Sequence, residues 1–319
     1  MKVLIVRLSS LGDVVHTLPL AANARRSGAQ VYWVAEAAYR DLLSANPSID
    51  RVFVADTKGW RRRPFSPRTF RQIAELRRDL SALAVDVTID AQGLWKSALI
   101  ARAAGAPVVG FCAGARREPT SAILGHRSVQ PLAGGHVVDQ NLSLAEAAGL
   151  TVFERRPDAR FLLARPSLPA RDFLEGQARP FALYHPGARR PEKTWGEERF
   201  ARLGDLLRTG SGLAPVVSWG PGDEGRAGRL AALLPGARLL PLLDLPALAH
   251  VMAAASLVVA GDTGPLHLAD AVGARTLALF GPTDPGRNGP YGQPGSVVRY
   301  DSKTNAEEVA GKAIEVLAA

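Results

Sequence analysis

The sequence predicts an α/β protein of two domains, and three observations support this. Its 319 residues exceed one ordinary α/β domain and suit two, each able to bury its own core. Apolar runs of strand length alternate with amphipathic segments of helical period, which is typical of parallel sheets covered by helices. A Pro-rich, irregular stretch over residues 164–179 interrupts this alternation. We therefore expect domains over residues 1–165 and 166–319, with a cleft between them.

Each half is predicted to carry five strands joined by helices, so both domains are expected to be Rossmann-like. Apolar spacings of three and four residues predict helices over 69–83 and, around a turn at Gly93, over 90–103. A last helix over 306–317 belongs to the second domain or packs back on the first. The expected strands are 3–6, 31–35, 52–54, 85–89 and 108–111, then 181–184, 216–219, 238–240, 257–260 and 276–280.

Composition excludes several classes of protein. No apolar run reaches the roughly 18 residues that a membrane span requires. The apolar stretch after Met1 is too short for a signal peptide, so a cytoplasmic location is expected. The single cysteine, Cys112, excludes an internal disulfide and a cysteine-based metal cluster.

The net charge of +9 is unevenly distributed. Residues 1–155 hold 20 Lys and Arg against 13 Asp and Glu. Such an excess suits a polyanionic partner, whether nucleic acid, anionic lipid or phosphorylated glycan. Arginine-rich coding bias is the alternative explanation, and the sequence does not decide between them.

The turn after the first expected strand carries a candidate catalytic carboxylate. Residues 9–17 read SSLGDVVHT and place Asp13 at the start of a helix. Ligands of open α/β sheets bind at the carboxyl ends of strands, so Asp13 is a candidate base. Capping of the helix is the other interpretation. The turn lacks the G-x-G-x-x-G pattern, which argues against a nicotinamide-dependent dehydrogenase.

A second candidate site lies in the other half, where residues 258–269 read VVAGDTGPLHLA. This pattern predicts a buried strand, a tight turn and a helix with Pro265 in its first turn. The N–H groups of a helix start can bind a diphosphate, and Asp262 and His267 would lie near the same ligand. A capped turn with a buried histidine is the structural alternative.

Three further turns are expected on the same edge of that sheet. Residues 185–195 (HPGARRPEKTW) supply cations, among them Lys193, that can neutralise a diphosphate. Residues 219–224 (WGPGDE) supply a carboxylate suited to a ribose diol, and residues 281–285 (GPTDP) form a rigid turn.

Together these motifs resemble the bacterial lipopolysaccharide heptosyltransferases (glycosyltransferase family 9), and among them the enzymes that add the first heptose to the Kdo sugar of the inner core. The resemblance covers essentially the whole chain. It rests on KVLIV at 2–6 with SSLGD at 9–13, IDAQGL at 89–94 with Lys96-Ser97, Arg117-Glu118-Pro119, Lys193 with Trp195, Asp262-Thr263-Gly264 with His267, and GPTDP at 281–285.

The resemblance implies a GT-B fold and an inverting, metal-independent transfer from ADP-L-glycero-β-D-manno-heptose, with no cofactor. Asp13 matches the catalytic base. The implied donor-binding residues are Lys193, Glu224, Leu243, Asp262, Thr263, Gly264 and His267, together with Gly187 and Ala188, where family members often carry hydroxyl side chains and backbone N–H groups would substitute.

The acceptor implied by the resemblance is Kdo-lipid A at the inner face of the cytoplasmic membrane. Residues 58–63 (KGWRRR) keep the basic and aromatic character expected for binding its carboxylates and phosphates. We expect a monomer that associates peripherally with the anionic membrane and binds no metal and no nucleic acid. The expected acceptor-binding residues are Ser10, Gly12, Arg61, Arg62, Arg63, Gln92, Lys96 and Arg117.

Other functions stay open at this point. One is heptosyltransferase II, or another transferase of the family that uses an ADP-sugar. Another is a non-hydrolysing sugar-nucleotide epimerase, which would bind a donor without needing an acceptor. A basic nucleic-acid-binding protein is a third, although no recognised motif for it occurs in the sequence.

Overall fold

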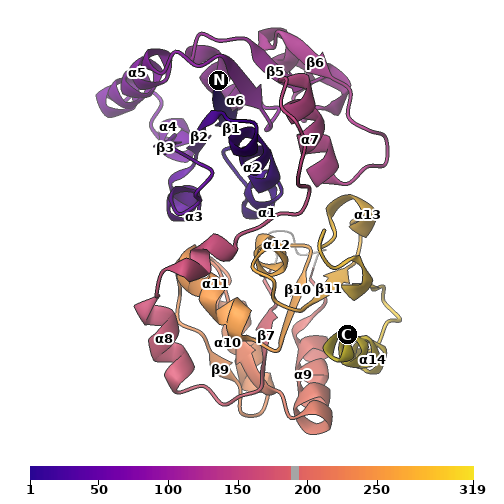
Figure 1. Ribbon diagram of the computed structural model, residues 1–319. Coiled ribbons are helices and arrows are strands. Elements are labelled where there is room, and N and C mark those ends of the chain that lie inside the picture. The colour runs from indigo at the N-terminus through magenta and orange to yellow at the C-terminus, as the bar shows by residue number, and fades with distance from the viewer. Residues whose placement is uncertain (188–193) are drawn as a thin grey trace. The chain divides into compact units, whose positions relative to one another are not determined.

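The computed structural model describes residues 1–187 and 194–319 and divides into two compact units, Met1–Pro157 and Asp158–Ala319 (Figure 1). The division precedes the expected boundary at residue 165. The 3-10 helix η4 (Arg160–Ala164) packs on helix α11 (Leu245–Ala254), and the Ala159 N–H donates to the Ala271 carbonyl at 2.8 Å. These contacts tie the segment after Pro157 to the second unit.

The first unit is built on a six-stranded parallel sheet in the order β3-β2-β1-β4-β5-β6. Its strands are β1 (Lys2–Val6), β2 (Gln30–Ala35), β3 (Arg51–Val54), β4 (Val87–Asp90), β5 (Val108–Phe111) and β6 (Arg127–Val129). Its helices are α1 (Leu11–Val15), α2 (Leu18–Arg26), α3 (Arg40–Ser44), α4 (Thr57–Arg62), α5 (Pro67–Ala82), α6 (Trp95–Ala103) and α7 (Val137–Ala147), with 3-10 turns η1 (Ala37–Tyr39), η2 (Ala113–Ala115) and η3 (Pro119–Leu124).

The second unit repeats this architecture, with a six-stranded parallel sheet in the order β12-β11-β10-β7-β8-β9. Its strands are β7 (Phe181–His185), β8 (Ala214–Val217), β9 (Arg238–Leu239), β10 (Leu257–Gly261), β11 (Thr276–Phe280) and β12 (Val297–Arg299). Its other helices are α8 (Leu168–Glu175), α9 (Glu197–Ser211), α10 (Glu224–Leu233), α12 (Gly264–Ala271), α13 (Pro285–Asn288) and α14 (Ala306–Ala318), with the 3-10 turn η6 (Pro294–Ser296).

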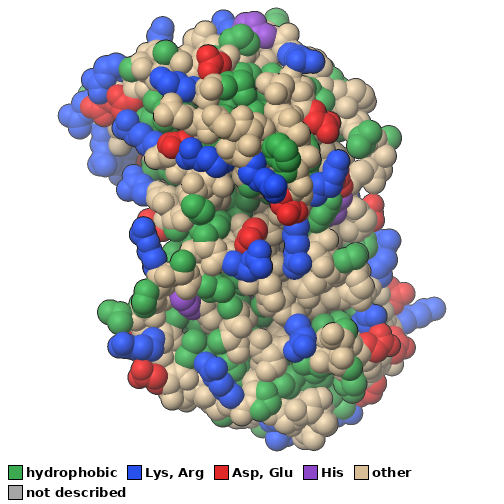
Figure 2. All heavy atoms as spheres, in the orientation of Figure 1, with side chains coloured by type: hydrophobic (Ala, Val, Ile, Leu, Met, Phe, Trp, Pro, Cys, Tyr) green, Lys and Arg blue, Asp and Glu red, His purple; other side chains and the backbone are tan. Residues whose placement is uncertain are grey.

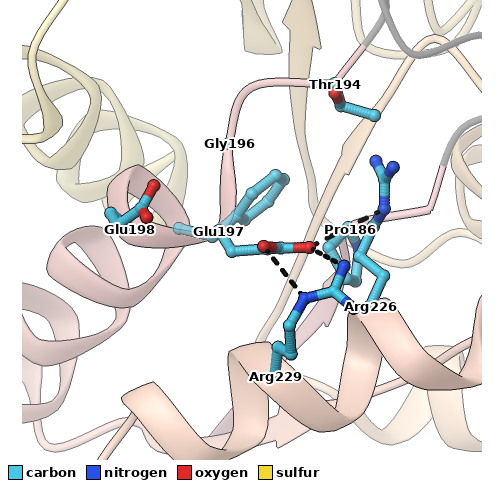
Figure 3. A pocket seen from close by; sticks show the side chains of 8 residues that line it. Pro186, Thr194, Gly196, Glu197, Glu198, Arg226 and Arg229 are labelled. Atoms are coloured by element: carbon cyan, nitrogen blue, oxygen red, sulfur yellow. Dashed lines mark hydrogen bonds and ion pairs between the residues drawn. The ribbon is translucent and has the colours of Figure 1, made fainter.

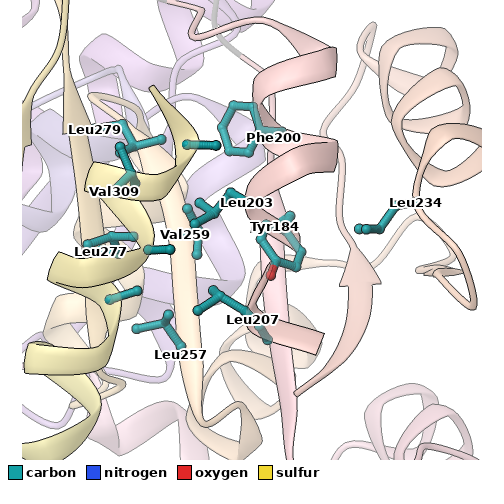
Figure 4. Close-up of a cluster of buried hydrophobic side chains, with 14 of the residues drawn as sticks. Tyr184, Phe200, Leu203, Leu207, Leu234, Leu257, Val259, Leu277, Leu279 and Val309 are labelled. Carbon is teal, nitrogen blue, oxygen red and sulfur yellow. The ribbon is translucent and has the colours of Figure 1, made fainter. Parts of the chain in front are cut away.

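Each unit buries its own apolar core, which explains why the central strands are uninterrupted apolar runs. In the first unit, Leu4 and Val6 cluster with Leu80 of α5 and Ile100 of α6. In the second, side chains of β7, β10 and β11 pack under helices α9 and α14 (Figure 4). Helix α14 packs on α9 and β11 inside the second unit. Of the two expected positions, in the second domain or packed back on the first, the structure shows the former.

The main differences between the expected elements and the structure are at two edge strands, one helix start and the end of β8. The edge strands β6 and β12, of three residues each, were not expected. Strand β4 runs to Asp90 and the next helix begins only at Trp95, so a helix starting at residue 90 is wrong. Strand β8 ends at Val217 rather than at residue 219.

The chain order reverses once in each sheet, between β1 and β4 and between β7 and β10. At such a point the two neighbouring connections leave in opposite directions and open a crevice at the carboxyl ends of the strands. The loops after β1, β4, β7 and β10 are therefore where each unit is expected to hold a ligand.

Candidate active site

Asp13 lies directly after the switch point of the first unit, in helix α1. Its carboxylate Oδ2 accepts hydrogen bonds from the backbone N–H of Ser10 at 3.0 Å and from the Ser10 hydroxyl at 2.8 Å. Ser10 is the N-cap residue of α1, so Asp13 does cap this helix. Its side chain nevertheless remains 39% exposed, so capping leaves part of the carboxylate accessible. Gly12, also expected at the site, is buried in the same turn.

Arg7 is the ionic partner of Asp13, and sequence reasoning missed it. Its Nη2 lies 2.6 Å from Asp13 Oδ1, and its Nη1 donates to the carbonyl of Ala91. Burial alone would raise the pKa of Asp13, but the Arg7 guanidinium and the hydrogen bonds from Ser10 outweigh it and lower that pKa below its usual value. Asp13 is therefore an ionised carboxylate at neutral pH.

Gln92 joins the two loops at this switch point. Its Oε1 accepts hydrogen bonds from the backbone N–H groups of Leu8 at 2.8 Å and Ser9 at 3.1 Å. The loop after β4 thus supports the loop after β1 that leads into Asp13. Gln92 was expected to bind the acceptor, and this stays a prediction; its amide oxygen accepts these two backbone N–H groups.

A buried ion pair holds Gln92 in turn. Asp90 Oδ1 accepts from the N–H groups of Gln92 and Gly93, both at 3.2 Å, while its Oδ2 lies 3.0 Å from Arg116 Nη1. Both side chains of the pair are at most 1% exposed. A Cβ at Gly110 would collide with the Arg116 guanidinium, so the pair requires a glycine there. Asp90 and Arg116 therefore support the loop that leads into Asp13 without facing solvent.

The basic residues expected at the acceptor site lie on α4, on α6 and in the segment before η3. Lys96 Nζ donates to the Thr57 hydroxyl at 2.9 Å and lies 3.8 Å from the buried carboxylate of Glu36. Arg61 and Arg62 end helix α4, and Arg63 is its C-cap residue. These three side chains and Arg117 are exposed.

In the second unit the loop after β10 forms the expected tight turn. Thr263 is the N-cap residue of α12, which begins at Gly264. The carboxylate of Asp262 lies 3.5 Å from Nε2 of His267, and both side chains are at most 9% exposed. The N–H groups of Leu266 and His267 bond back to the Thr263 carbonyl, and Pro265 has no N–H, so an incoming anion would meet those of Thr263 and Gly264.

Three other expected donor-binding positions follow neighbouring strands on this edge. Gly187 follows β7, and a Cβ there would lie 2.5 Å from Asp223 Oδ2, so this backbone closely approaches that carboxylate. Glu224 is exposed at the first residue of α10, after β8, and Leu243 is half-buried in the loop after β9. Lys193 and Ala188, also expected to bind the donor, lie outside the described residues.

A pocket of about 320 Å³ lies beside Gly196, at the start of α9 (Figure 3). Glu197 lines it and pairs with Arg229 at 2.7 Å and with Arg226 at 3.9 Å. The hydrogen bond from Arg229 lowers the pKa of Glu197, against the opposing effect of burial. Pro186 and Thr194 of the lining belong to the turn over 185–195 that the sequence singled out, whereas Arg226 and Arg229 come from α10, a contact that no local motif could indicate.

The histidines play structural roles where the described contacts define them. Burial lowers the pKa of His185 to about 4, so its imidazole is neutral, and its Nδ1 lies 3.1 Å from the Ser218 hydroxyl. The buried ring of His16 packs edge-on against that of His136. Over residues 1–187 and 194–319, no three His, Cys, Asp or Glu side chains cluster as metal ligands would.

Comparison with known proteins identifies the family. Residues 73–317 match glycosyltransferase family 9 (heptosyltransferase). The chain is 36% identical over 298 residues to lipopolysaccharide heptosyltransferase 1 of Pseudomonas aeruginosa, covering 92% of this chain and 82% of the relative. It is 34% identical to lipopolysaccharide heptosyltransferase 1 of Escherichia coli K12, covering 94% and 93%.

Solved structures agree with the sequence comparison. The structure described as E. coli heptosyltransferase WaaC with ADP superposes with a TM-score of 0.84 at 32% identity, covering 99% of this chain and 100% of that one. The structure of the same enzyme with ADP-2-deoxy-2-fluoro heptose gives a TM-score of 0.81 at 31% identity, with both chains covered fully. The fold is thus GT-B, and the chain belongs to glycosyltransferase family 9, the heptosyltransferases.

Proposed function

We propose that this glycosyltransferase transfers L-glycero-D-manno-heptose from ADP-heptose to the Kdo of lipid A-Kdo, with inversion at the anomeric carbon and without a metal ion. The observation that carries the proposal is the ionised, partly exposed Asp13 carboxylate at the switch point of the first unit. Relatives named lipopolysaccharide heptosyltransferase 1 support the substrate class.

In this proposal the donor binds along the carboxyl ends of four adjacent strands, β10, β7, β8 and β9. Strands lie about 4.8 Å apart, so this edge spans about 14 Å, which suits an extended nucleotide sugar. Asp262 and the helix start at Thr263 and Gly264 hold the heptose and diphosphate after β10. The carboxylates of Asp223 and Glu224 after β8 suit the ribose diol, and Leu243 after β9 suits the adenine.

Asp13 acts as the general base. It accepts the proton of the Kdo hydroxyl as oxygen attacks the anomeric carbon, while the α12 start stabilises charge developing on the ADP leaving group. Ser10 and Arg7 orient the carboxylate for this step. No Asp-x-Asp triplet, a common metal-binding arrangement in sugar transfer, occurs in the sequence, which supports a reaction without metal.

The acceptor is lipid-linked, and the enzyme meets it as a monomer at the inner face of the cytoplasmic membrane. Arg61, Arg62, Arg63 and Arg117 are exposed cations of the first unit that suit Kdo carboxylates and lipid A phosphates. Across the described helices, none is both long and apolar enough to cross a bilayer.

The direct test incubates the purified chain with ADP-heptose and Kdo-lipid A and follows ADP release, with and without a chelator. We expect release that requires the acceptor and is unchanged by the chelator. Release that requires an acceptor already carrying one heptose would indicate the heptosyltransferase II activity instead. Consumption of donor without any acceptor would indicate an epimerase or hydrolase, and loss of activity with chelator would refute the metal-free reaction.

Arg7→Met is expected to shift the acidic limb of the profile of kcat/KM against pH to higher pH. Without the guanidinium, the burial that raises the pKa of Asp13 is opposed only by Ser10, so protonation inactivates the base at a higher pH. Because the native pKa is lowered, the carboxylate also stabilises the fold above the ordinary Asp pKa, and that stabilisation fades as pH falls through the native value.

Arg25→Met is the matched control, because Arg25 pairs with Asp50 at 2.7 Å in the same unit, away from the switch point. It should leave the pH profile unchanged. An acidic limb that stays in place in Arg7→Met would contradict the assignment of Asp13 as the titrating base.

A further inference from the structure

The basic excess of the first unit is concentrated in one segment. Residues 57–82, which form α4, α5 and their connection, hold eight Lys and Arg against two Asp and Glu. The rest of residues 1–155 holds twelve against eleven and is nearly neutral. Figure 2 shows these cations gathered over α4 and α5, at the upper left. General arginine-rich coding would spread the charge along the chain, whereas here it is local.

The same segment exposes large apolar side chains. Phe65 in the connection is 86% exposed, and Phe70 and Ile73 on α5 are 58% and 43% exposed. Farther along α5, Leu76 and Leu80 join the core of the unit. Phe70 and Ile73 are three residues apart and lie on the same side of the helix as Leu80, but nearer its N-terminus, where they stay exposed. Core packing explains the C-terminal part of this apolar stripe and leaves its exposed N-terminal part without a structural role.

Few of the cations are neutralised. Arg71 lies 3.9 Å from Glu75 and Arg78 lies 3.2 Å from Asp79, both as exposed pairs. For Arg61, Arg62, Arg63, Arg68 and Arg77, no acidic partner occurs within 4.0 Å among the residues that the structure describes. The surface of residues 57–82 thus combines free positive charge with protruding apolar groups.

We propose that this surface docks the enzyme on an anionic lipid bilayer, with Phe65, Phe70 and Ile73 entering the interface and the arginines contacting lipid phosphates. A bilayer accepts aromatic and aliphatic side chains together beneath a layer of anions. A single-stranded nucleic acid matches the charge and would stack its bases on Phe65 and Phe70, but it gives the aliphatic Ile73 no comparable stacking contact, whereas a bilayer accepts all three side chains. The inference rests on the proposed function only in that a lipid-linked acceptor gives docking its purpose.

Flotation of the full chain with vesicles tests the proposal. We expect binding to vesicles containing about one third phosphatidylglycerol, weak binding to pure phosphatidylcholine, and loss of binding at high salt. Phe65→Ser with Phe70→Ser should weaken binding to the anionic vesicles about tenfold, because the anchors are lost while the charge stays. Arg68→Gln with Arg77→Gln should weaken it by a similar or larger factor, at about fivefold per cation.

Phe153→Ser is the matched control. Phe153 is a 50% exposed phenylalanine of the same unit with the guanidinium of Arg26 over its ring, outside the segment. Its variant should bind vesicles as the native chain does. Equal binding of neutral and anionic vesicles, unchanged binding by the Phe65/Phe70 variant, or tighter binding to single-stranded RNA than to anionic vesicles would overturn the proposal.

A lipid-free Kdo acceptor separates this proposal from the proposed function. Turnover of that acceptor should be the same in the native chain and the Phe65/Phe70 variant, while turnover of Kdo-lipid A in anionic vesicles should fall in the variant. If no Kdo acceptor is turned over but vesicle binding behaves as described, the function is wrong and the docking surface stands. If turnover occurs without any vesicle binding, the docking surface is wrong and the proposed function stands.

Discussion

Asp13→Ala is expected to lower kcat by about 10²- to 10⁴-fold, the usual contribution of a general base. Binding of ADP in the second unit should stay close to native, because the role proposed for Asp13 is proton transfer and the diphosphate site is proposed in the second unit. Steady-state kinetics with saturating acceptor, together with calorimetric titration of ADP, measure the two quantities separately.

Asp13 also caps α1 and neutralises Arg7, so the alanine variant leaves a buried guanidinium without its partner. Asp13→Asn also leaves Arg7 without a counter-ion, but it is the more informative variant, since it keeps the size of the side chain and an oxygen for Ser10 while it removes the ionisable carboxylate. Asp50→Asn serves as a control: Asp50 is 32% exposed, pairs with Arg25 and accepts the Val31 N–H at 2.6 Å at the amino end of the sheet. The Asp50→Asn control should keep native-like turnover. Native-like turnover by Asp13→Asn would refute the assignment of Asp13 as the base.

Asp90→Asn is expected to lower the free energy of unfolding of the first unit by about 3–5 kcal/mol, because it leaves the Arg116 guanidinium buried without a counter-ion. Denaturant unfolding followed by tryptophan fluorescence measures the loss. Each unit has its own core, so a separately resolved transition of the second unit would be an internal reference. Activity should fall as well, since Asp90 holds the turn of Gln92, whose side chain supports the loop that leads into Asp13.

Two further variants separate the ion pair from general damage. Asp90→Asn combined with Arg116→Met should recover part of the stability, because no unpaired charge then remains buried. Arg78→Met breaks the exposed pair with Asp79, at 3.2 Å in the same unit, and should cost at most about 1 kcal/mol. If Asp90→Asn cost no more than Arg78→Met, the pair would not stabilise the loop as described.

The sequence was sufficient for the central strands and for the location of the candidate site. Strands β1 and β10 are apolar runs because both faces of a parallel sheet are buried, and this pattern needs no tertiary information. Asp13 and Asp262 follow such strands directly, so their place at the carboxyl edges followed from the chain order of the elements. Edge strands β6 and β12 are short and partly exposed, which removes that pattern.

The missed parts depend on contacts between distant residues. Arg7 and Arg116 resemble any other arginine in the sequence, and only the fold brings them to Asp13 and Asp90. The helix expected from residue 90 was wrong because the Asp90 side chain bonds the turn at Gly93, whose φ of +70° suits glycine and interrupts the helix. Lys96 stays a predicted acceptor-binding residue, and its contacts with Thr57 and Glu36 could not be predicted from the sequence.

The concentration of cations over residues 57–82 gives the first unit an electric dipole moment directed toward α4 and α5. A field of negative charge would rotate the diffusing molecule so that this side leads, before any contact forms. Ionic strength should therefore change the association rate with an anionic bilayer far more than the dissociation rate. In the proposed docking, the dissociation rate is governed by Phe65 and Phe70 inserted in the bilayer. Stopped-flow measurements of the two rate constants over a range of salt would separate orientation in solution from retention at the surface.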